Sequence, residues 1–160
     1  MKSKAVAPSV ADFWNAAGGL AAEFGWPAKT SESGREAVTV ALTPSDPLYE
    51  RMIWIYDTER ITLRCLLVSA QTVPAKRCVA ILELCARINE GLPFGCAEYS
   101  FGEKVVVFRD SADLGWQAVD EVVKSCTARS LNLGRKYADS IRSTLADGKS
   151  EAAVRKAEAS

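Results

Sequence analysis

Apolar residues near the start of the chain recur at the spacing of one helical face. They are Val10, Phe13, Trp14, Ala17, Leu20, Ala21 and Phe24. Ser9 precedes this stretch and an acid, Asp12, follows three positions later, which is typical of a helix N-terminus. Residues 25–27 (Gly-Trp-Pro) break the pattern, and the polar residues 29–35 are typical of a loop. We therefore predict an amphipathic helix followed by a loop.

Three segments then carry the alternation typical of β-strands, at residues 36–42, 51–56 and 61–68. The second segment is rich in aromatic and β-branched residues, and the third places large apolar side chains at every other position. Short polar connections separate the three segments. Because short connections join neighbouring strands as hairpins, we predict an antiparallel meander.

The next predicted element is a helix, since apolar residues again recur on one face. Its apolar stripe consists of Cys78, Ile81, Leu82, Cys85, Ile88 and Leu92. Pro74 suits the first turn, where a missing N–H costs no helical hydrogen bond. At the other end we expect Gly91 to adopt a left-handed conformation, and Pro93 prevents the helix from continuing.

Two further strands, at residues 96–101 and 104–109, flank a short turn and predict a second hairpin. The four consecutive apolar residues 105–108 are typical of a strand that is covered on both faces. A long helix is expected to begin near residues 111–113 and to extend to about residue 146. It would be longer than the average globular helix.

The order of elements, α-β-β-β-α-β-β-α, predicts an α+β fold in which helices pack against an antiparallel sheet. We expect a single domain over residues 9–146, because 160 residues suit one hydrophobic core. Residues 1–8 are expected to be a flexible N-terminus. Residues 147–160 are small and charged, and we expect them to form a flexible polar tail.

The charges balance at 20 basic and 20 acidic side chains, and no run of Lys or Arg is longer than a pair. A nucleic-acid partner is therefore not expected, because its phosphates require a basic patch. No apolar segment is long enough for a signal peptide or a membrane span. Five cysteines without a C-x-x-C pair suit a reducing compartment, so we predict a cytoplasmic protein with no membrane partner.

Residues for catalysis or metal binding are scarce in the sequence. The chain has no histidine, the commonest general base and metal ligand, and none of the common phosphate-binding or nucleophile motifs. Asp57 and Glu59 form a close acid pair, but they lie in a predicted hairpin turn, where solvated acids are common. We therefore expect no catalytic residues, no metal and no cofactor. Catalysis by Lys, Asp or Cys stays open as the weakest alternative.

The junction between the second helix and the next strand reads Ile-Asn-Glu-Gly-Leu-Pro-Phe-Gly at residues 88–95. An asparagine in the last helical turn followed by Leu-Pro-Phe-Gly resembles the YbjN-like proteins, described as sensory transduction regulators and similar in fold to type III secretion chaperones. The order of elements over residues 9–145 fits the same resemblance. The resemblance implies a homodimer without catalytic residues that binds a partner polypeptide along an exposed apolar surface. Secretion chaperones are often acidic, so this neutral chain favours a regulatory or stress-linked adaptor.

The strand at residues 51–56 supplies the candidate partner-binding residues. Met52, Trp54 and Tyr56 share one face, and Ile53 and Ile55 share the other. Met, Trp and Tyr are enriched at protein interfaces, which makes their face the candidate for the partner-binding surface. The alternative is that the helices bury both faces of the strand.

The second helix supplies the candidate interface of the homodimer. If its apolar stripe is wider than one sheet face can cover, Val79, Leu84 or Ile88 would meet a symmetry-related copy. The predicted function is a non-catalytic chaperone-like or adaptor protein that captures an extended or amphipathic segment of its partner. A small-molecule-binding regulatory module, with a pocket between the sheet and the helices, is the alternative.

Overall fold

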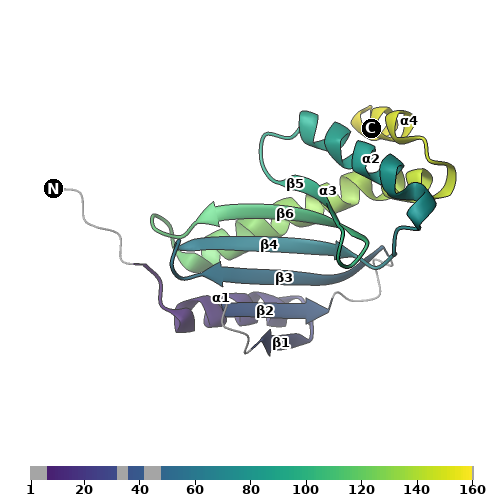
Figure 1. Ribbon diagram of the computed structural model, residues 1–160. Helices are drawn as coiled ribbons and strands as arrows, with labels where there is room; N and C mark the ends of the chain where they lie inside the picture. Colours follow the sequence, from purple (N-terminus) through teal and green to yellow (C-terminus); the bar gives the residue numbers. More distant parts are fainter. Residues whose placement is uncertain (1–6, 32–35, 42–47, 160) are drawn as a thin grey trace.

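The computed structural model describes residues 7–31, 36–41 and 48–159, and Figure 1 shows its helices and strands. The helices are α1 (Val10–Glu23), α2 (Cys78–Glu90), α3 (Val119–Asp147), α4 (Ser150–Glu158) and the short 3-10 turn η1 (Ala75–Arg77). The strands are β1 (Ala28–Ser31), β2 (Glu36–Ala41), β3 (Tyr49–Asp57), β4 (Thr62–Ser69), β5 (Cys96–Ser100) and β6 (Val105–Asp113). All five strands predicted from the sequence are present, together with one more, β1.

The strands form one sheet in the order β1-β2-β3-β4-β6-β5, and every neighbouring pair is antiparallel. The predicted α+β class, with helices packed on an antiparallel sheet, is therefore confirmed. β6 lies between β4 and β5, so the chain passes from β4 through α2 to the edge of the sheet and then returns inward.

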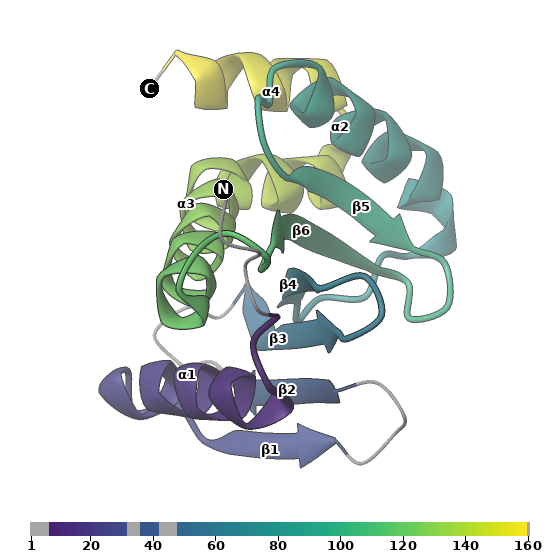
Figure 2. The same ribbon diagram turned by 90° about the vertical axis from the view of Figure 1, so that its left-hand side faces the viewer.

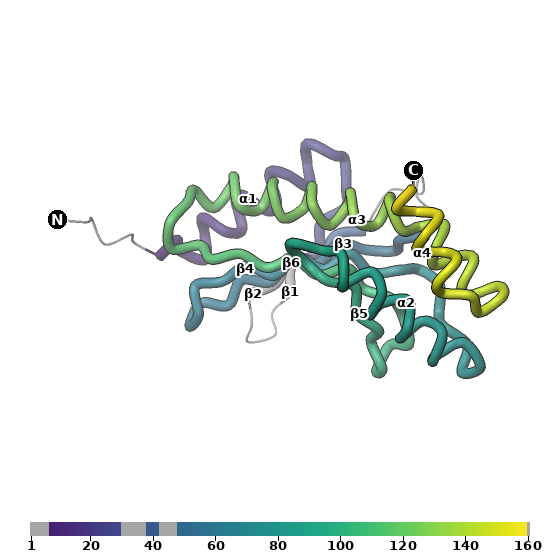
Figure 3. Tube along the Cα trace, turned by 90° about the horizontal axis from the view of Figure 1, so that it is seen from above, coloured from purple at the N-terminus to yellow at the C-terminus, as the bar shows by residue number. Residues whose placement is uncertain are grey.

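The long helix α3 and the first helix α1 cover the same face of the sheet, and Figure 3 shows both on one side of the strands. α1 packs on β2 and β3, whereas α3 packs on β4 and β6. α2 lies beside the edge strand β5 (Figure 2), and α4 packs against both α2 and α3. The opposite face of β3, β4 and β6 has no described helix over it (Figure 3).

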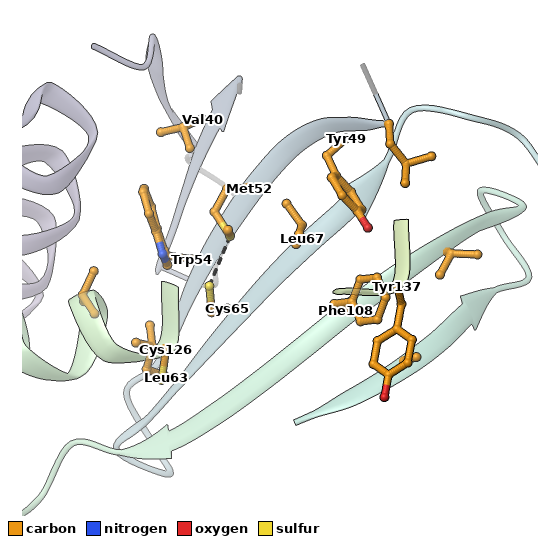
Figure 4. Packing of buried hydrophobic residues seen from close by; sticks show 14 of the residues in the cluster. Val40, Tyr49, Met52, Trp54, Leu63, Cys65, Leu67, Phe108, Cys126 and Tyr137 are labelled. Carbon is orange, nitrogen blue, oxygen red and sulfur yellow. Dashed lines mark hydrogen bonds between the residues drawn. The ribbon is translucent and has the colours of Figure 1, made fainter. Parts of the chain in front are cut away.

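The core lies between the sheet and the helices, and Figure 4 shows part of it. Alternate residues of β3, β4 and β6 point into it, as the two-residue period of a strand requires. Phe108 stacks on Tyr137 of α3 at a ring-centroid distance of 6.5 Å, and Tyr49 meets the Phe108 ring edge-on at 6.3 Å. These aromatic contacts join β3, β6 and α3.

Two helix ends show how local sequence sets the boundaries. At the start of α1 the Ser9 hydroxyl accepts from the Asp12 N–H at 3.1 Å, and the Asp12 carboxylate accepts from the Ser9 N–H at 2.9 Å. These two bonds confirm the capping box. At the end of α2, Gly91 has a φ of −97°, so the predicted left-handed conformation is wrong. At this junction the residue with a positive φ is Gly95, at 71°. A Cβ added to Gly95 would lie 3.1 Å from the carbonyl oxygen of Arg109.

Asn89, in the last turn of α2, holds the start of β5. Its side-chain oxygen accepts from the Ala97 N–H at 2.7 Å, and its side-chain nitrogen donates to the Ala97 carbonyl oxygen at 3.0 Å. The amide thus satisfies two backbone groups on the outer edge of β5, as a neighbouring strand would. These bonds give the asparagine of the 88–95 junction a structural role.

Two segments belong to a different kind of element than predicted. Residues 29–31, predicted as part of the loop 29–35, lie in the edge strand β1 because they pair with β2. Residues 111–113, predicted as the start of a helix, continue β6 along β4, so that α3 begins only at Val119.

The two predicted flexible ends also need correction. Residues 150–158 form α4 and pack on α2 and α3, so the prediction of a flexible tail is wrong there. Of the predicted flexible N-terminus, residues 1–6 lie outside the described residues. The carbonyl oxygen of Pro8 accepts a hydrogen bond from the Tyr56 hydroxyl at 2.8 Å.

Candidate partner-binding surface

The sheet face opposite α1 and α3, which we term the open face, faces the viewer in Figure 1. It carries apolar side chains from three adjacent strands, and no described helix packs over them (Figure 3). The open-face residues are Ile53, Ile55, Leu66, Val68, Val105 and Val107. An uncovered apolar surface is the usual mark of an interaction site.

The strand register places these side chains beside one another. Ile53 lies opposite Leu66, and Val68 lies between its partners Arg51 and Val107. Val68 and Val107 are 3% and 9% exposed, whereas Ile53 and Leu66 are half-buried. The valine side chains therefore bury one another on this face. The half-buried side chains of Ile53, Ile55 and Leu66, which we term the apolar rim, stay open to contact.

Two ion pairs border the open face. The Arg109 guanidinium donates to the Glu98 carboxylate of β5 at 2.6 Å, and Arg51 forms an ion pair with Glu103 of the β5–β6 turn. All four side chains are partly exposed, so solvent screens each pair and its contribution to stability is small. The pairs mark the boundary of the apolar area.

Arg64 stands on the open face between Ile55 of β3 and Ser111 of β6. It is half-buried and, within the described ranges, makes no hydrogen bond or ion pair. The acids nearest in register, Asp57 and Asp113, each accept a backbone N–H from a turn instead. The Arg64 guanidinium is therefore available to an acceptor outside this chain.

The structure places the predicted partner-binding residues in the core, on the other face of β3. Met52, Trp54 and Tyr56 are 0%, 0% and 2% exposed. The Trp54 indole N–H donates to the Thr127 hydroxyl of α3 at 2.8 Å. The Cys65 thiol donates to the Met52 sulfur at 3.2 Å (Figure 4). The prediction that this face is exposed is wrong, because α1 and α3 cover it.

Of the three predicted dimer residues, only Val79 is on the surface. Leu84 and Ile88 are 0% exposed, on the side of α2 that packs against β5 and α3, so they cannot meet a second copy. Val79 is 78% exposed, and Leu82, one turn further along the same side of α2, is 38% exposed. An apolar contact between copies would therefore use the outer side of α2.

Burial keeps the core thiols protonated. It raises the pKa of Cys65 to about 12, that of Cys85 to about 12 and that of Cys126 to about 11. A protonated thiol is a poor nucleophile and a poor metal ligand. In the part of the chain that the structure describes, no three Cys, Asp or Glu side chains are grouped so that they could hold a metal ion.

An ion pair between a buried carboxylate and a partly exposed guanidinium joins α3 to the sheet. Asp110 of β6 is 3% exposed, and its carboxylate accepts from the Arg129 guanidinium at 2.5 Å. Arg129 also donates to the Cys126 sulfur at 3.2 Å. Loss of Arg129 would leave the buried Asp110 carboxylate without its cation, so this cluster has a structural explanation.

A hollow of about 570 Å³ lies between the connection after β4 and the C-terminal part of α3. Its size is in the range of small-molecule sites. Among its described lining residues the one charged side chain, Arg142, is already paired with Asp139 at 2.8 Å. The lining residues are Leu48, Ala70, Gln71, Thr72, Pro74, Arg142, Leu145 and Ala146.

Comparison of the chain with protein-family models, with curated proteins and with solved structures finds no match. The resemblance to the YbjN-like proteins therefore stays a prediction. Among the described helices, none has the length and apolar character needed to cross a membrane.

The placement of arginines in the sequence identifies the open face. A search for the residue types that are enriched at interfaces misses this feature. Arg51 is in phase with Ile53 and Ile55 along β3, and Arg64 and Arg109 occupy the same face of β4 and β6. Arginine is almost never fully buried, so three arginines on one face mark the side without a helix. The aromatic residues on the opposite face indicate core rather than interface.

Proposed function

We propose that this protein is a non-catalytic chaperone-like or adaptor protein that binds a partner polypeptide on the open face of its sheet. The observation that carries the proposal is the half-buried apolar rim formed by Ile53, Ile55 and Leu66, over which no described helix lies. The 88–95 junction, which resembles that of the YbjN-like proteins, supports the same class of function in a regulatory or stress-linked role. A cytoplasmic location fits the five free thiols.

The chemistry of the open face defines the partner segment. Apolar side chains of the partner would cover Ile53 and Leu66, because burial of apolar area is the main driving force of association. A carboxylate of the partner would meet Arg64, whose guanidinium has no acceptor among the described residues. The expected partner is thus a segment with apolar residues around an acidic one.

Affinity capture with matched variants tests this surface. Arg64→Glu and Leu66→Asp should each lose the polypeptide that the unchanged chain retains, whereas Ala128→Asp, on the exposed surface of α3, should retain it. Circular dichroism and urea unfolding establish that each variant is folded before capture. Retention of the same polypeptide by all three variants would show that the open face is not the binding surface.

A homodimer through the outer side of α2 is part of the proposal, supported by the exposure of Val79 and Leu82. Light scattering should give twice the mass of one chain, 17.3 kDa, at micromolar concentration. Val79→Asp should reduce the mass to that of one chain, while the equally polar change Ala128→Asp, on exposed α3 surface, should not. A single-chain mass for the unchanged protein would contradict the dimer.

The hollow beside Arg142 favours the second candidate, a small-molecule-binding regulatory module. A ligand that binds only the folded chain raises its melting temperature. A thermal-shift screen in which Thr72→Trp removes the shift, while Thr58→Trp in the β3–β4 turn keeps it, would support this function. The absence of any stabilising compound would leave partner binding as the function.

A further inference from the structure

α4 is a short helix that packs against both α2 and α3 (Figures 1 and 2), and we term the surface of these two helices that it covers the α2–α3 groove. Ser150, Ala153 and Val154 are 3%, 7% and 5% exposed and face into the groove. Their spacing of three and four residues places them on one side of the helix. The groove therefore fits a helix that presents small side chains.

Contacts along both walls of the groove hold α4 in register. On the α3 side, the Ser140 hydroxyl donates to the Ala153 carbonyl oxygen at 2.9 Å. On the α2 side, Arg87 lies 3.8 Å from the Glu151 carboxylate. Near the end of α4, a Cβ added to Gly91 would lie 3.4 Å from a carboxylate oxygen of Glu158. The groove is thus shaped for the sequence of α4 itself.

The seat of α4 is incompletely filled. A hollow of about 290 Å³ follows the seam between α2 and α4, where Glu90 and Arg155 are among its lining residues. The ion pair between Arg87 and Glu151 is partly exposed, so solvent screens it. α4 is therefore held by small apolar side chains, by the Ser140 hydrogen bond and by partly exposed polar contacts, a small set that permits release from the groove.

The connection between α3 and α4 is a tight hinge that depends on glycine. Gly148 has a φ of 81°, and its N–H donates to the Thr144 carbonyl oxygen at 2.9 Å. A Cβ at this position would lie 2.6 Å from an Nη of Arg77, which packs against the hinge. The turn that folds α4 back onto its own groove is therefore available to glycine and strained for other residues.

We propose that α4 is an exchangeable arm, and that α4 of one copy occupies the α2–α3 groove of a second copy. The contacts of α4 are the same whether it binds its own groove or that of the other copy. The conformation of the hinge at Gly148 and the chain concentration then decide between the two arrangements. If residues 148 and 149 became helical, α3 and α4 would form one continuous helix, and α4 would point away from its own groove.

A cross-linking experiment between two populations of the full chain tests the exchange. One population carries Gly91→Cys and the other carries Glu158→Cys, and a short bismaleimide is added after mixing. Covalent dimer joining positions 91 and 158 in excess of random collision requires that α4 enters the groove of the other copy. A mixture of Gly102→Cys, in the β5–β6 turn, with Glu158→Cys is the matched control for random collision and for the native thiols.

The expected result is more covalent dimer from the 91/158 mixture than from the control mixture, with the 91–158 peptide identified by mass spectrometry. Equal yields from the two mixtures would overturn the proposal. Adding Gly148→Ala to both chains should raise the 91/158 yield, because it strains the closed hinge. Gly18→Ala, a glycine in α1 with free space around it, should leave the yield unchanged. An unchanged yield with Gly148→Ala would also overturn it.

The proposed exchange of α4 extends the proposed homodimer, and different measurements would contradict the two proposals. A dimer through Val79 on α2 would double the mass in light scattering without any 91–158 cross-link. Exchange of α4 would give the cross-link even when Val79→Asp has removed the α2 contact. Val154→Asp should abolish only the cross-link, because it places a charge on the buried side of α4.

Discussion

The phenol of Tyr49, at the start of β3, donates a 2.7 Å hydrogen bond to the carbonyl oxygen of Gly134, in the middle of α3. The two residues are 85 positions apart, so the bond ties the beginning of the sheet to its covering helix. A Cβ on Gly134 would overlap a methyl group of Leu67 and lie 3.1 Å from the Tyr49 ring. α3 therefore approaches the sheet at this point more closely than a side chain would allow.

Gly134→Ala should destabilise the fold by about 1–3 kcal/mol, the typical cost of overpacking a filled core. The added methyl group must displace Leu67 or Tyr49, since α3 and the sheet are already in contact. Urea unfolding measures the difference. Ser143→Ala, on the exposed side of the same helix, should change stability by no more than about 0.5 kcal/mol. Equal losses of stability from Gly134→Ala and Ser143→Ala would contradict the close approach of α3 to the sheet.

Trp54→Ala should destabilise the fold by about 3–5 kcal/mol, because it removes a fully buried indole and leaves the Thr127 hydroxyl without its donor. The same change at Trp116, which is 74% exposed, should have little effect. Denaturant midpoints of the two variants give the comparison directly. A stable fold with Trp54→Ala would return this residue to the list of surface candidates.

Asn89→Ala should loosen the edge strand β5 and lower the free energy of unfolding by about 1–3 kcal/mol. The reason is that the N–H and the C=O of Ala97 both lose their hydrogen-bond partner. Asn89→Asp keeps the acceptor and loses the donor, so its carboxylate would face the Ala97 carbonyl oxygen. Hydrogen exchange at residues 96–100 should become faster in both variants than in Glu90→Ala, whose side chain is exposed on the next position of the helix. Unchanged protection of β5 would refute the role of Asn89.

The free energy of unfolding should fall as the pH rises from about 9 toward 12. The pKa of Cys65 is about 12 in the folded chain against 9.0 as its reference, because burial disfavours the thiolate. The unfolded chain therefore loses this proton first, and the stabilising effect of burying the neutral thiol is complete below pH 9 and lost as pH approaches 12. Urea unfolding at pH 8, 9 and 10 should show a steeper fall for the unchanged chain than for Cys65→Ala. Parallel curves would show that this thiol does not contribute.

The strands and the α+β class were predictable from the sequence because side-chain alternation depends on the strand period alone. The helix stripe of α2 and the capping box at Ser9 follow from similarly local rules. β1 and α4 were not predictable in this way, because both are polar segments that are ordered by pairing or packing with distant parts of the chain. Residues 111–113 became strand for the same reason, through their pairing with β4.

The candidate surface was harder to predict than the fold. Alternation in β3 separates Trp54 from Ile53, but it does not say which of the two faces the helices will cover. Which face is covered depends on the side of the sheet against which α1 and α3 pack. No short segment of the sequence determines that side. The prediction of Leu84 as a dimer residue failed for a related reason, since β5 and α3 together cover a wider side of α2 than one sheet face would.

β6 occupies a central position in the sheet but is synthesised after β5, the strand at its edge. The β4 edge that β6 will cover stays unpaired on the ribosome until residues 70–104 have been added, which takes roughly 2–7 s at ordinary translation rates. During this interval the backbone groups and apolar side chains of the half-built sheet are open to neighbouring nascent chains. The speed of translation across residues 70–104 therefore sets how long the growing chain is exposed to aggregation.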